Sequence, residues 1–385
     1  MKKSAILTII LFLFFFCSPK GEKVERIIED GVEVVINHRE PYELKGESST
    51  LTLEEELIID TEREDLAEVG IGEFPAFDAD SSGNIYLWTQ RSPENFIFKF
   101  DKNGNFLKSF GRVGQGPGEM QFVVGVSINR DDEIMITESR RSKLITLDTD
   151  GIFVDEKSIS NYISMVIPLC NEKYLAGFYE YSPEAEYNHS LMVLYSSDFE
   201  RIKELDRAKR ENIILAKSIE GVSHGRVMGI TPSNIYLGYS GRGYEIWVYD
   251  LEGNFQRKIR KDYLPVPVTE EYKKKYLKRY ERAPDEIRKK IYFPKHQPPF
   301  QMGFSDDEGR LFVMTYEKGE RPNTYKYDIF NTSGVFIGRT SLENYGQYGT
   351  SDSPLYAMAK KDRLYYIRQK ESGFKELAVY NMKWE

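Results

Sequence analysis

The chain has 385 residues, enough for one large closed β structure or for roughly two or three ordinary domains. Its 26 Tyr and 23 Phe favour strands over helices, because aromatic side chains fit a pleated, half-buried surface. The formal net charge of −8 argues against a general nucleic-acid-binding protein, which is usually basic, so we expect no nucleic-acid partner.

Residues 1–17 have the pattern of a targeting segment. Two lysines precede an apolar run that ends at Phe16 and is too short to cross a bilayer comfortably. Cys17 follows and is itself followed by Ser-Pro, which resembles a bacterial lipoprotein signal with Cys17 as the lipidated first residue. Phe16 stands where such signals usually carry a small residue, so a noncleaved anchor and ordinary secretion are alternatives. We expect a cell-envelope protein, held at the membrane by an N-terminal lipid anchor or free in the periplasm or outside the cell.

The second cysteine, Cys170, has no partner for an internal disulfide if Cys17 is lipidated. It ends the apolar run that begins at Val166. We therefore predict a small buried thiol and not a nucleophile.

Residues 18–49 are predicted to form an N-terminal hairpin and a linker. Val24 to Asn37 contains two β-rich runs around an Asp-Gly turn. After a polar linker, Leu51 to Asp60 (LTLEEELIID) has the pattern of one strand with no neighbouring partner in the sequence. Its partner should therefore be far away along the chain.

A repeated unit begins at Phe77. An apolar run, a DSSGN turn and a second β-rich run are followed by two strands around a KNGN turn, which together predict a four-stranded antiparallel meander. One such sheet buries too little apolar surface to be stable alone, so the pattern should recur. Later copies are predicted from Glu133 to Glu156, Tyr174 to Leu205, Asn234 to Ile259, Arg310 to Arg339 and Arg363 to Tyr380.

The last copy lacks its fourth strand, because the chain ends with NMKWE after Tyr380. A three-stranded sheet would leave an unpaired edge, which proteins generally avoid. We predict that Leu51 to Asp60 supplies the missing outer strand. This exchange would close residues 50–385 into a ring of six four-stranded blades.

The units GNIYLW, FIFKFDKNGNFLKSFG and GQGPGE resemble NHL-type repeats. From about Gly31 to Trp384 the chain resembles the bacterial six-bladed β-propeller lipoproteins of that group. The resemblance implies an all-β, six-bladed β-propeller closed by an N-terminal strand in the last blade. It implies no particular activity, since propellers host unrelated functions. We expect a monomer.

Residues 264–299, between blades 4 and 5, interrupt the β pattern and predict a small helical insertion. Thr269 can cap a first helix and Pro284 can start a second. Tyr272, Tyr276 and Tyr280 share one face and should pack downwards. Residues 270–295 carry ten basic and five acidic side chains, which we interpret as a solvated surface. A basic element that binds anionic envelope polymers is the alternative.

The loops between the second and third strands of the blades should meet on one face, where strand one of each blade also begins. These loops are TQRSPEN, TESRRSK, YEYSPEAEYNH, YSGRGYE, YEKGERPNT and RQKESGFK. Loops on a rigid ring are well placed to bind a ligand, although polar loops are also ordinary surface. The residues expected around this mouth are Arg91, Glu138, Arg140, Arg141, Tyr179, Tyr181, Arg242, Tyr316, Lys318, Arg321 and Arg368.

Two motifs that suggest ligands have better structural explanations. GRVGQGPGEM lacks the GK[ST] of a phosphate loop, so its glycines should shape a crossing between blades while Glu119 holds nearby backbone donors. DADSSGN resembles the start of a calcium loop, but its twelfth position is Thr89, so we predict a β-turn.

The sequence predicts no metal, cofactor or catalytic residue. His189, His224 and His296 lead towards the candidate face, but their spacing is not a ligand motif. Calcium-dependent six-bladed lactonases place acidic and amide side chains on their inner strands. Here the corresponding positions hold Phe122, Val123, Ser164, Gly225, Phe300 and Leu355, with only Glu73 acidic.

The sequence therefore favours a noncatalytic binding or scaffold module that recognises a peptide, protein or glycan at the channel mouth. The alternative is a propeller hydrolase or lyase that acts in the channel, with a metal on one of the three histidines.

Overall fold

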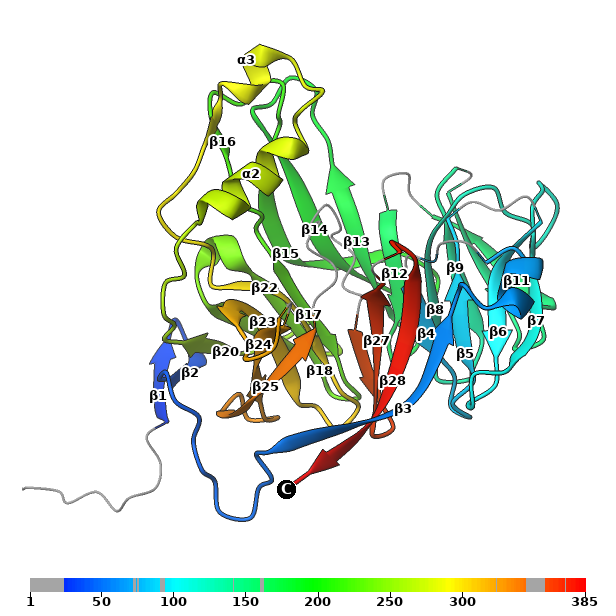
Figure 1. Cartoon of the computed structure of the whole chain (residues 1–385), viewed down its shortest axis with the longest axis horizontal. Helices are drawn as coiled ribbons and strands as arrows, with labels where there is room; N and C mark the ends of the chain where they lie inside the picture. The colour runs from blue at the N-terminus through cyan, green and yellow to red at the C-terminus, as the bar shows by residue number, and fades with distance from the viewer. Residues whose placement is uncertain are drawn as a thin grey trace, which may run out of the picture.

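The computed structural model describes residues 24–71, 74, 76–90, 94–140, 142–159, 163–322, 324–343, 357–370 and 372–385. Cys17, Arg91 and Arg141 lie outside these residues. The described chain is almost entirely β, and its strands form six four-stranded blades (Figure 1). The predicted six-bladed β-propeller is confirmed.

The first three blades are separate antiparallel sheets. Blade 1 contains β4 (Ala76–Ala79), β5 (Ile85–Trp88), β6 (Asn95–Phe100) and β7 (Phe106–Arg112). Blade 2 contains β8 (Val123–Ile128), β9 (Ile134–Glu138), β10 (Lys143–Leu147) and β11 (Phe153–Ser158). Blade 3 contains β12 (Ile163–Pro168), β13 (Tyr174–Glu180), β14 (Tyr187–Tyr195) and β15 (Arg201–Glu211).

The last three blades follow the same order along the chain. Blade 4 contains β17 (Arg226–Ile230), β18 (Asn234–Tyr239), β19 (Glu245–Asp250) and β20 (Phe255–Lys261), with a 3-10 turn at Ser240–Arg242. Blade 5 contains β22 (Phe300–Ser305), β23 (Leu311–Lys318), β24 (Thr324–Phe330) and β25 (Phe336–Glu343). Blade 6 contains β26 (Ala357–Lys360), β27 (Arg363–Gln369), β28 (Lys375–Trp384) and β3 (Leu51–Asp60).

The closing strand is where the sequence predicts it. β3 runs antiparallel to β28, from the pair Leu51 and Trp384 to the pair Asp60 and Glu376 (Figure 1). The backbone N–H groups of Ser49 and Thr50 also donate to the carbonyl of the last residue, both at 3.0 Å. The N-terminal and C-terminal parts of the chain are therefore joined in one blade.

The N-terminal hairpin is also confirmed, with β1 (Glu25–Glu29) paired to β2 (Val32–Asn37). It is not an isolated element, because β2 adds in parallel to the outer edge of β20. The innermost strands of blades 4 and 5, β17 and β22, also pair in parallel. The hairpin and these two blades consequently form one ten-stranded sheet. Gly225 permits this approach, since a Cβ there would lie 2.0 Å from the Gln301 carbonyl oxygen.

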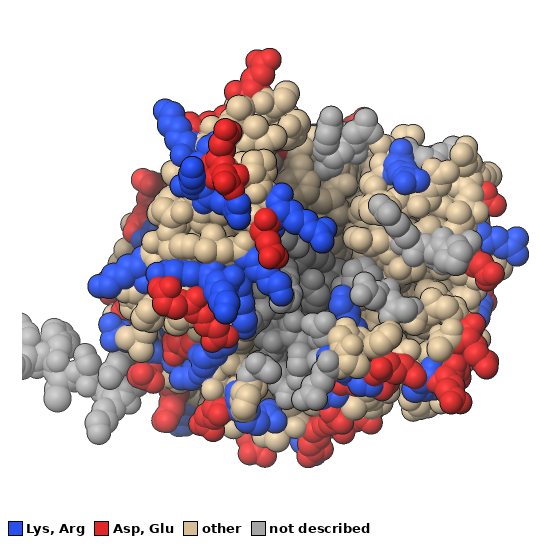
Figure 2. All heavy atoms as spheres, turned by 45° about the horizontal axis from the view of Figure 1, so that its top comes forward, with Lys and Arg blue, Asp and Glu red and all other residues tan. Residues whose placement is uncertain are grey.

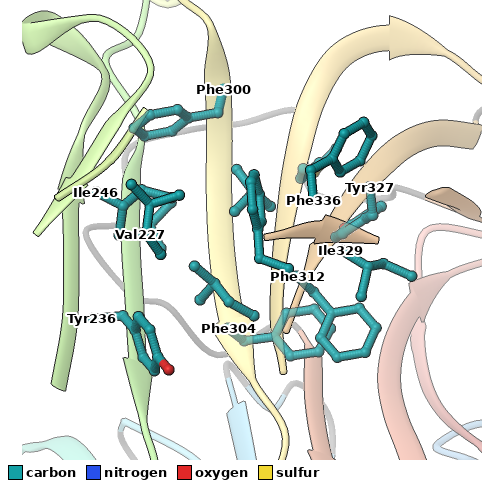
Figure 3. Close-up of a cluster of buried hydrophobic side chains, with 14 of the residues drawn as sticks. Val227, Tyr236, Ile246, Phe300, Phe304, Phe312, Tyr327, Ile329 and Phe336 are labelled. Carbon is teal, nitrogen blue, oxygen red and sulfur yellow. The ribbon is translucent and has the colours of Figure 1, made fainter. Parts of the chain in front are cut away.

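The hydrophobic core lies between neighbouring blades. Leu377 of blade 6 packs with Phe77 of blade 1, and further buried clusters join blades 1 and 2, blades 2 and 3, and blades 3 and 4. The largest joins blades 4, 5 and 6, and Figure 3 shows Val227 of blade 4 beside Phe300 and Phe304 of blade 5. Each blade is therefore stabilised by its neighbours, as the small size of one sheet requires.

A single turn chemistry recurs between strands. A side-chain oxygen of Asp or Asn accepts the backbone N–H of the residue four positions later, and glycine with a φ of 78° to 93° follows three positions after six of these residues. Asp132 takes the glycine position in the seventh turn, with a φ of 62°. DADSSGN is one of these turns, so the β-turn prediction is confirmed. The capping residues are Asp80, Asp101, Asn129, Asp148, Asp250, Asp306 and Asn331.

The glycine-rich crossing from blade 1 to blade 2 is held by Glu119, as predicted. Its carboxylate accepts the backbone N–H groups of Gln115 at 2.9 Å and Gly116 at 2.8 Å. A Cβ on Gly114 would lie 2.0 Å from the same carboxylate oxygen, so a larger residue here would displace Glu119 from these backbone groups.

The prediction that Cys170 is buried is wrong. β12 ends at Pro168, and Cys170 lies exposed in the turn that follows. The apolar run extends beyond the strand, and its length therefore overestimates how far the buried segment reaches.

The insertion contains α2 (Glu270–Lys278), α3 (Asp285–Arg288) and β21 (Ile291–Tyr292), and β21 pairs with β16 (Ile219–Glu220). The hydroxyl of Thr269 caps α2 by accepting the Tyr272 N–H at 3.2 Å. Tyr276 stacks on Tyr272 and Tyr280 and is only 7% exposed, so the downward packing of the tyrosines is confirmed. No helix among the described residues, including α1 (Glu64–Glu68), is long and apolar enough to cross a membrane.

Replacing Thr52 and Lys383 with cysteine should produce a disulfide between β3 and β28. The two residues are directly opposite, and opposed Cα atoms in an antiparallel pair lie about 4.5–5.5 Å apart, within disulfide reach. The crosslink should raise the free energy of unfolding by about 2–4 kcal/mol, measured by denaturant titration with and without reductant. The control pair, Thr52→Cys with Asn381→Cys, is two residues out of register. Equal crosslinking of both pairs would contradict the observed pairing.

The turn residue Asp306 should make stability depend on pH. Its side chain is 4% exposed, and burial raises its pKa to about 6 despite the nearby Arg310. The folded state then binds a proton more readily than the unfolded chain, so the free energy of unfolding should fall as pH rises from about 4 to 6. Asp306→Asn should reduce this fall by about 2–3 kcal/mol, measured by urea titration across that range. Asp101→Asn, in an exposed turn where the pKa is lowered by Asn105, should not reduce it.

Candidate ligand-binding site

The loops that follow the second strand of each blade lie on one face, which we call the mouth face. The repeated antiparallel order makes β5, β9, β13, β18, β23 and β27 end on this side. The insertion leaves blade 4 on the same side, because the Lys261 N–H donates to the carbonyl of Tyr244 at the start of β19. Figure 2 looks towards this face and shows a hollow with Lys and Arg side chains gathered on the side of the insertion.

A cavity of about 290 Å³ opens between blades 5 and 6. Its lining includes Arg321 from the loop after β23 and Arg368 from β27, so two of the predicted ligand-binding residues share one pocket. The closing strand β3 contributes Glu55. Apolar and aromatic walls complete the cavity, and they include Leu342, Leu364, Tyr366 and Tyr380.

Arg368 is held firmly in this pocket. Its guanidinium donates to Glu55 at 3.0 Å, to the Tyr380 hydroxyl at 2.9 Å and to Glu376 at 2.8 Å. Burial disfavours its charged form, but Tyr380 and Glu376 outweigh burial and raise the pKa of Arg368. Arg368 is therefore charged, its charge is balanced by the neighbouring carboxylates, and its hydrogen bonds hold it in place as one wall of the cavity.

Arg321 differs from Arg368 because it is exposed and forms no ion pair with a described residue. Its carbonyl oxygen accepts the Thr324 hydroxyl at 2.6 Å, which fixes the backbone of the loop but leaves the guanidinium available. The pocket therefore has one free positive group at its rim. A guanidinium of this kind suits a carboxylate or phosphate on a ligand.

Arg242 lies in a second group, between blades 3 and 4. It forms an ion pair with Asp206, whose side chain has no exposed surface, and Arg226 binds the other oxygen at 3.0 Å. The Arg242 guanidinium also stacks 3.9 Å from the Trp247 ring. Arg242 thus holds neighbouring blades together, and this role competes with the ligand contact expected from the sequence.

Tyr316 and Lys318 are engaged within the protein. The Tyr316 hydroxyl donates to the Ser223 carbonyl at 3.0 Å, and Arg279 of the insertion donates to the Ser223 hydroxyl at 3.2 Å. Lys318 donates to the Tyr325 hydroxyl and lies 3.8 Å from the centre of that ring. Tyr316 therefore helps to fasten the crossing between blades 3 and 4 beneath the insertion.

The other predicted residues that the structure describes are spread over blades 2 and 3. Glu138 is buried and accepts the Phe122 N–H at 3.0 Å, whereas Arg140 is exposed. The Arg210 guanidinium lies over the Tyr179 ring at 5.2 Å, and Tyr181 is 58% exposed. The predicted residues that the structure describes thus share the mouth face but belong to several groups, of which only Arg321 and Arg368 are joined by a described cavity.

An acidic group that the sequence pattern does not predict lies beneath the insertion. Glu211 accepts the backbone N–H of Glu220, and the Glu220 carboxylate lies 2.9 Å from Nε2 of His224. Burial raises the pKa of Glu211, and the negative charge of Glu220 adds to this effect. β15 continues to Glu211, six residues beyond the predicted end of the strand at Leu205, so only its alternating pattern could have indicated this position.

The three candidate histidines are held in different places. His189 lies 3.3 Å from Glu180, His224 pairs with Glu220, and His296 is opposite Pro267 in an isolated bridge. In the described part of the chain, no group of three His, Cys, Asp or Glu side chains is arranged to hold a metal ion.

Comparison with known proteins supports the fold. Residues 79–226, less than half of the chain, match the family model DUF5128, described as a 6-bladed beta-propeller. No curated protein matches the chain. The matched segment runs from blade 1 to the first residue of blade 4.

Solved structures of two bacterial proteins are similar over most of their length. A Bacteroides fragilis protein inferred to be exported aligns with a TM-score of 0.50 and 12% identity, over 91% of this chain and 99% of that chain. A DUF4221-family protein of Bacteroides vulgatus aligns with a TM-score of 0.50 and 11% identity, over 88% of this chain and 100% of that chain. At such low identity the similarity concerns the fold alone, and it confirms the resemblance to bacterial propellers.

Asp206→Ala should lower the free energy of unfolding by about 3–5 kcal/mol, because Arg226 and Arg242 would lose the counterion for their partly buried charges. Urea titration followed by tryptophan fluorescence measures the change. Glu204→Ala removes a carboxylate from a more exposed ion-pair group on the same strand and should cost less than about 1 kcal/mol. Similar losses in the two variants would contradict the assignment of Asp206 as the link between blades.

Proposed function

We propose that this chain is a cell-envelope β-propeller that binds a peptide, protein or glycan at its mouth face without catalysing a reaction. The observation that carries the proposal is the cavity between blades 5 and 6, where a free Arg321 lies at the rim and an ion-paired Arg368 forms a wall. The leader-like N-terminus supports a location in the envelope.

The size of the cavity supports recognition of one residue of a longer ligand. At about 290 Å³ it lies just below the range for small-molecule pockets, which is roughly 300–1,000 Å³. A single sugar or amino-acid residue fits such a volume better than a large cofactor. The remainder of a polymer would lie across the loops of the mouth face.

The charges of the cavity favour an anionic residue. Glu55 and Glu376 already neutralise Arg368, so a neutral ligand would leave Arg321 without a partner. A carboxylate on the ligand could form a charge-assisted pair with Arg321, while its ring or side chain packs against Tyr366 and Tyr380. The ligand class is therefore an acidic glycan or an acidic peptide segment.

An enzyme remains the second candidate because of the group formed by Glu211, Glu220 and His224. A carboxyl group with a raised pKa beside a second carboxylate and an imidazole is a typical arrangement for proton transfer. This group lies under the insertion and shares no described cavity with Arg321. It would support a hydrolase or lyase acting at the channel mouth.

Arg321→Gln should weaken binding of an anionic oligomer at least roughly 10-fold, because one charge-assisted pair typically contributes about 1.5–3 kcal/mol. We would titrate trigalacturonate and triglutamate by calorimetry, with maltotriose and trialanine as neutral counterparts. The Lys102→Gln control removes an exposed cation from the turn at the opposite end of blade 1 and should leave affinity unchanged.

Binding of neither anionic probe, or equal binding of neutral and anionic probes, would contradict this assignment. Shortened products after incubation, lost in Glu211→Gln but kept in Arg321→Gln, would favour the enzyme instead.

A further inference from the structure

The insertion and the loop between β15 and β16 form a protruding tip, which we define as residues 212–220 and 264–299 (Figure 1). Several large apolar side chains on this tip are exposed to solvent, which is unusual. Ile214 is 71% exposed, and substantial fractions of Ile213, Leu215, Leu277 and Tyr292 are also exposed. A group of exposed apolar side chains on a projecting element is typical of a surface that contacts another body.

Positive charges outnumber negative ones around these apolar groups, although Glu281 and Glu286 are also exposed. The acidic residues Glu270, Glu271 and Asp285 each pair with a lysine or arginine of the same helix, so they do not neutralise the remaining cations. Lys290 donates to the Ile214 carbonyl at 2.9 Å, which places a cation next to the most exposed apolar residue. The cations that are exposed and form no ion pair with a described residue are Lys217, Lys274, Lys278, Arg282, Lys289 and Lys295.

The orientation of α2 separates its two faces. Tyr272 and Tyr276 point into the protein, where the Tyr276 hydroxyl donates to the Glu220 carbonyl at 3.1 Å. The opposite face carries Lys274, Leu277 and Lys278, at the spacing of neighbours on one side of a helix. The tip therefore presents apolar side chains flanked by lysines on a folded backbone. Little backbone conformational entropy would be lost when it contacts a partner.

We propose that this tip docks on the headgroup layer of an anionic membrane. Exposed apolar side chains can enter the headgroup boundary while lysines and arginines contact acidic lipids, the usual arrangement of an interfacial helix. The protein as a whole has a formal charge of −8, so an anionic surface would repel most of it and attract this region. The charge distribution should therefore orient the propeller as well as hold it.

The start of the described chain supports the same orientation. Glu25 is opposite Ile36, and Asn37 is opposite Lys261, so the chain enters blade 4 at the end from which the insertion leaves. Only residues 18–24 separate Cys17 from the hairpin, and seven extended residues span at most about 25 Å. A lipid on Cys17, as expected from the sequence, would keep this end of blade 4 near the bilayer.

The experiment measures sedimentation of the chain from Ser18 onwards, which retains all described elements, with sucrose-loaded vesicles. Vesicles of phosphatidylcholine with roughly 30% phosphatidylglycerol have a clearly negative surface potential and should bind the protein. Vesicles of phosphatidylcholine alone should not bind it. Binding should weaken strongly as salt rises from about 0.05 to 0.5 M, because the Debye length shortens.

Lys274→Gln with Lys278→Gln should lower the partition coefficient roughly 10- to 30-fold, since each lysine near an anionic surface contributes about 1 kcal/mol. Ile214→Ser should lower it separately, and at high salt this loss should persist. The matched control, Lys45→Gln with Lys102→Gln, removes the same charge from exposed positions outside the tip and should change little.

Equal losses in the tip and control variants, or absence of binding to the anionic vesicles, would overturn the proposal. If the tip instead served an acidic protein partner, binding to vesicles would be negligible while a partner crosslinked to the tip would be recovered from envelope fractions. These readouts do not involve Arg321, so the membrane contact and the ligand pocket can fail independently.

Discussion

The antiparallel pairing of β3 with β28 joins the two ends of the chain within a single blade. Without it, blade 6 would expose the backbone groups of β28 and could not complete the ring. The same strand buries Ile59 against blade 1 and places Glu55 beside Arg368 in the pocket. Closure of the ring and construction of the candidate site thus depend on one set of backbone hydrogen bonds.

Blades 4 and 5 are joined more tightly than blades that meet through side chains. Their inner strands share a sheet, and between their outer parts lies a buried charge network. Asp328 accepts the Tyr244 hydroxyl at 2.8 Å and the Arg339 guanidinium at 2.6 Å, and it lies 3.4 Å from Lys261. Burial lowers the pKa of Lys261, but Asp328 opposes this effect. This half of the ring carries the insertion and borders the pocket.

The sequence was sufficient to predict the blades because each repeat is specified by residues that lie close together along the chain. Alternating strands and the glycine three positions after Asp101, Asp250 and Asn331 specify hairpins without information from distant residues. The missing strand of blade 6 then indicated β3 by elimination. The parallel addition of β2 to β20 was not predictable in this way, because the sequence of neither strand indicates which strand it will pair with.

The candidate site was less predictable for a physical reason. The face of each loop follows from the strand order, but the partner of each long side chain does not. Arg242 and Arg368 both form ion pairs, yet Arg242 pairs with the buried Asp206 between blades 3 and 4, whereas Arg368 shares a cavity with Arg321 between blades 5 and 6. Glu211 and Glu220 were missed because they meet across the irregular loop between β15 and β16, where the Glu220 N–H donates to the Glu211 carboxylate.

The order in which the paired strands are synthesised has a consequence for how the protein matures. β3 is synthesised early, but β28 lies more than three hundred residues later. The ring therefore cannot close until β28 is available to pair with β3. A chain synthesised from its N-terminus therefore reaches its final topology only after β28 has been made. Until then β3 is an unpaired, partly apolar strand, and premature contact with another copy is the hazard that chaperones would need to prevent.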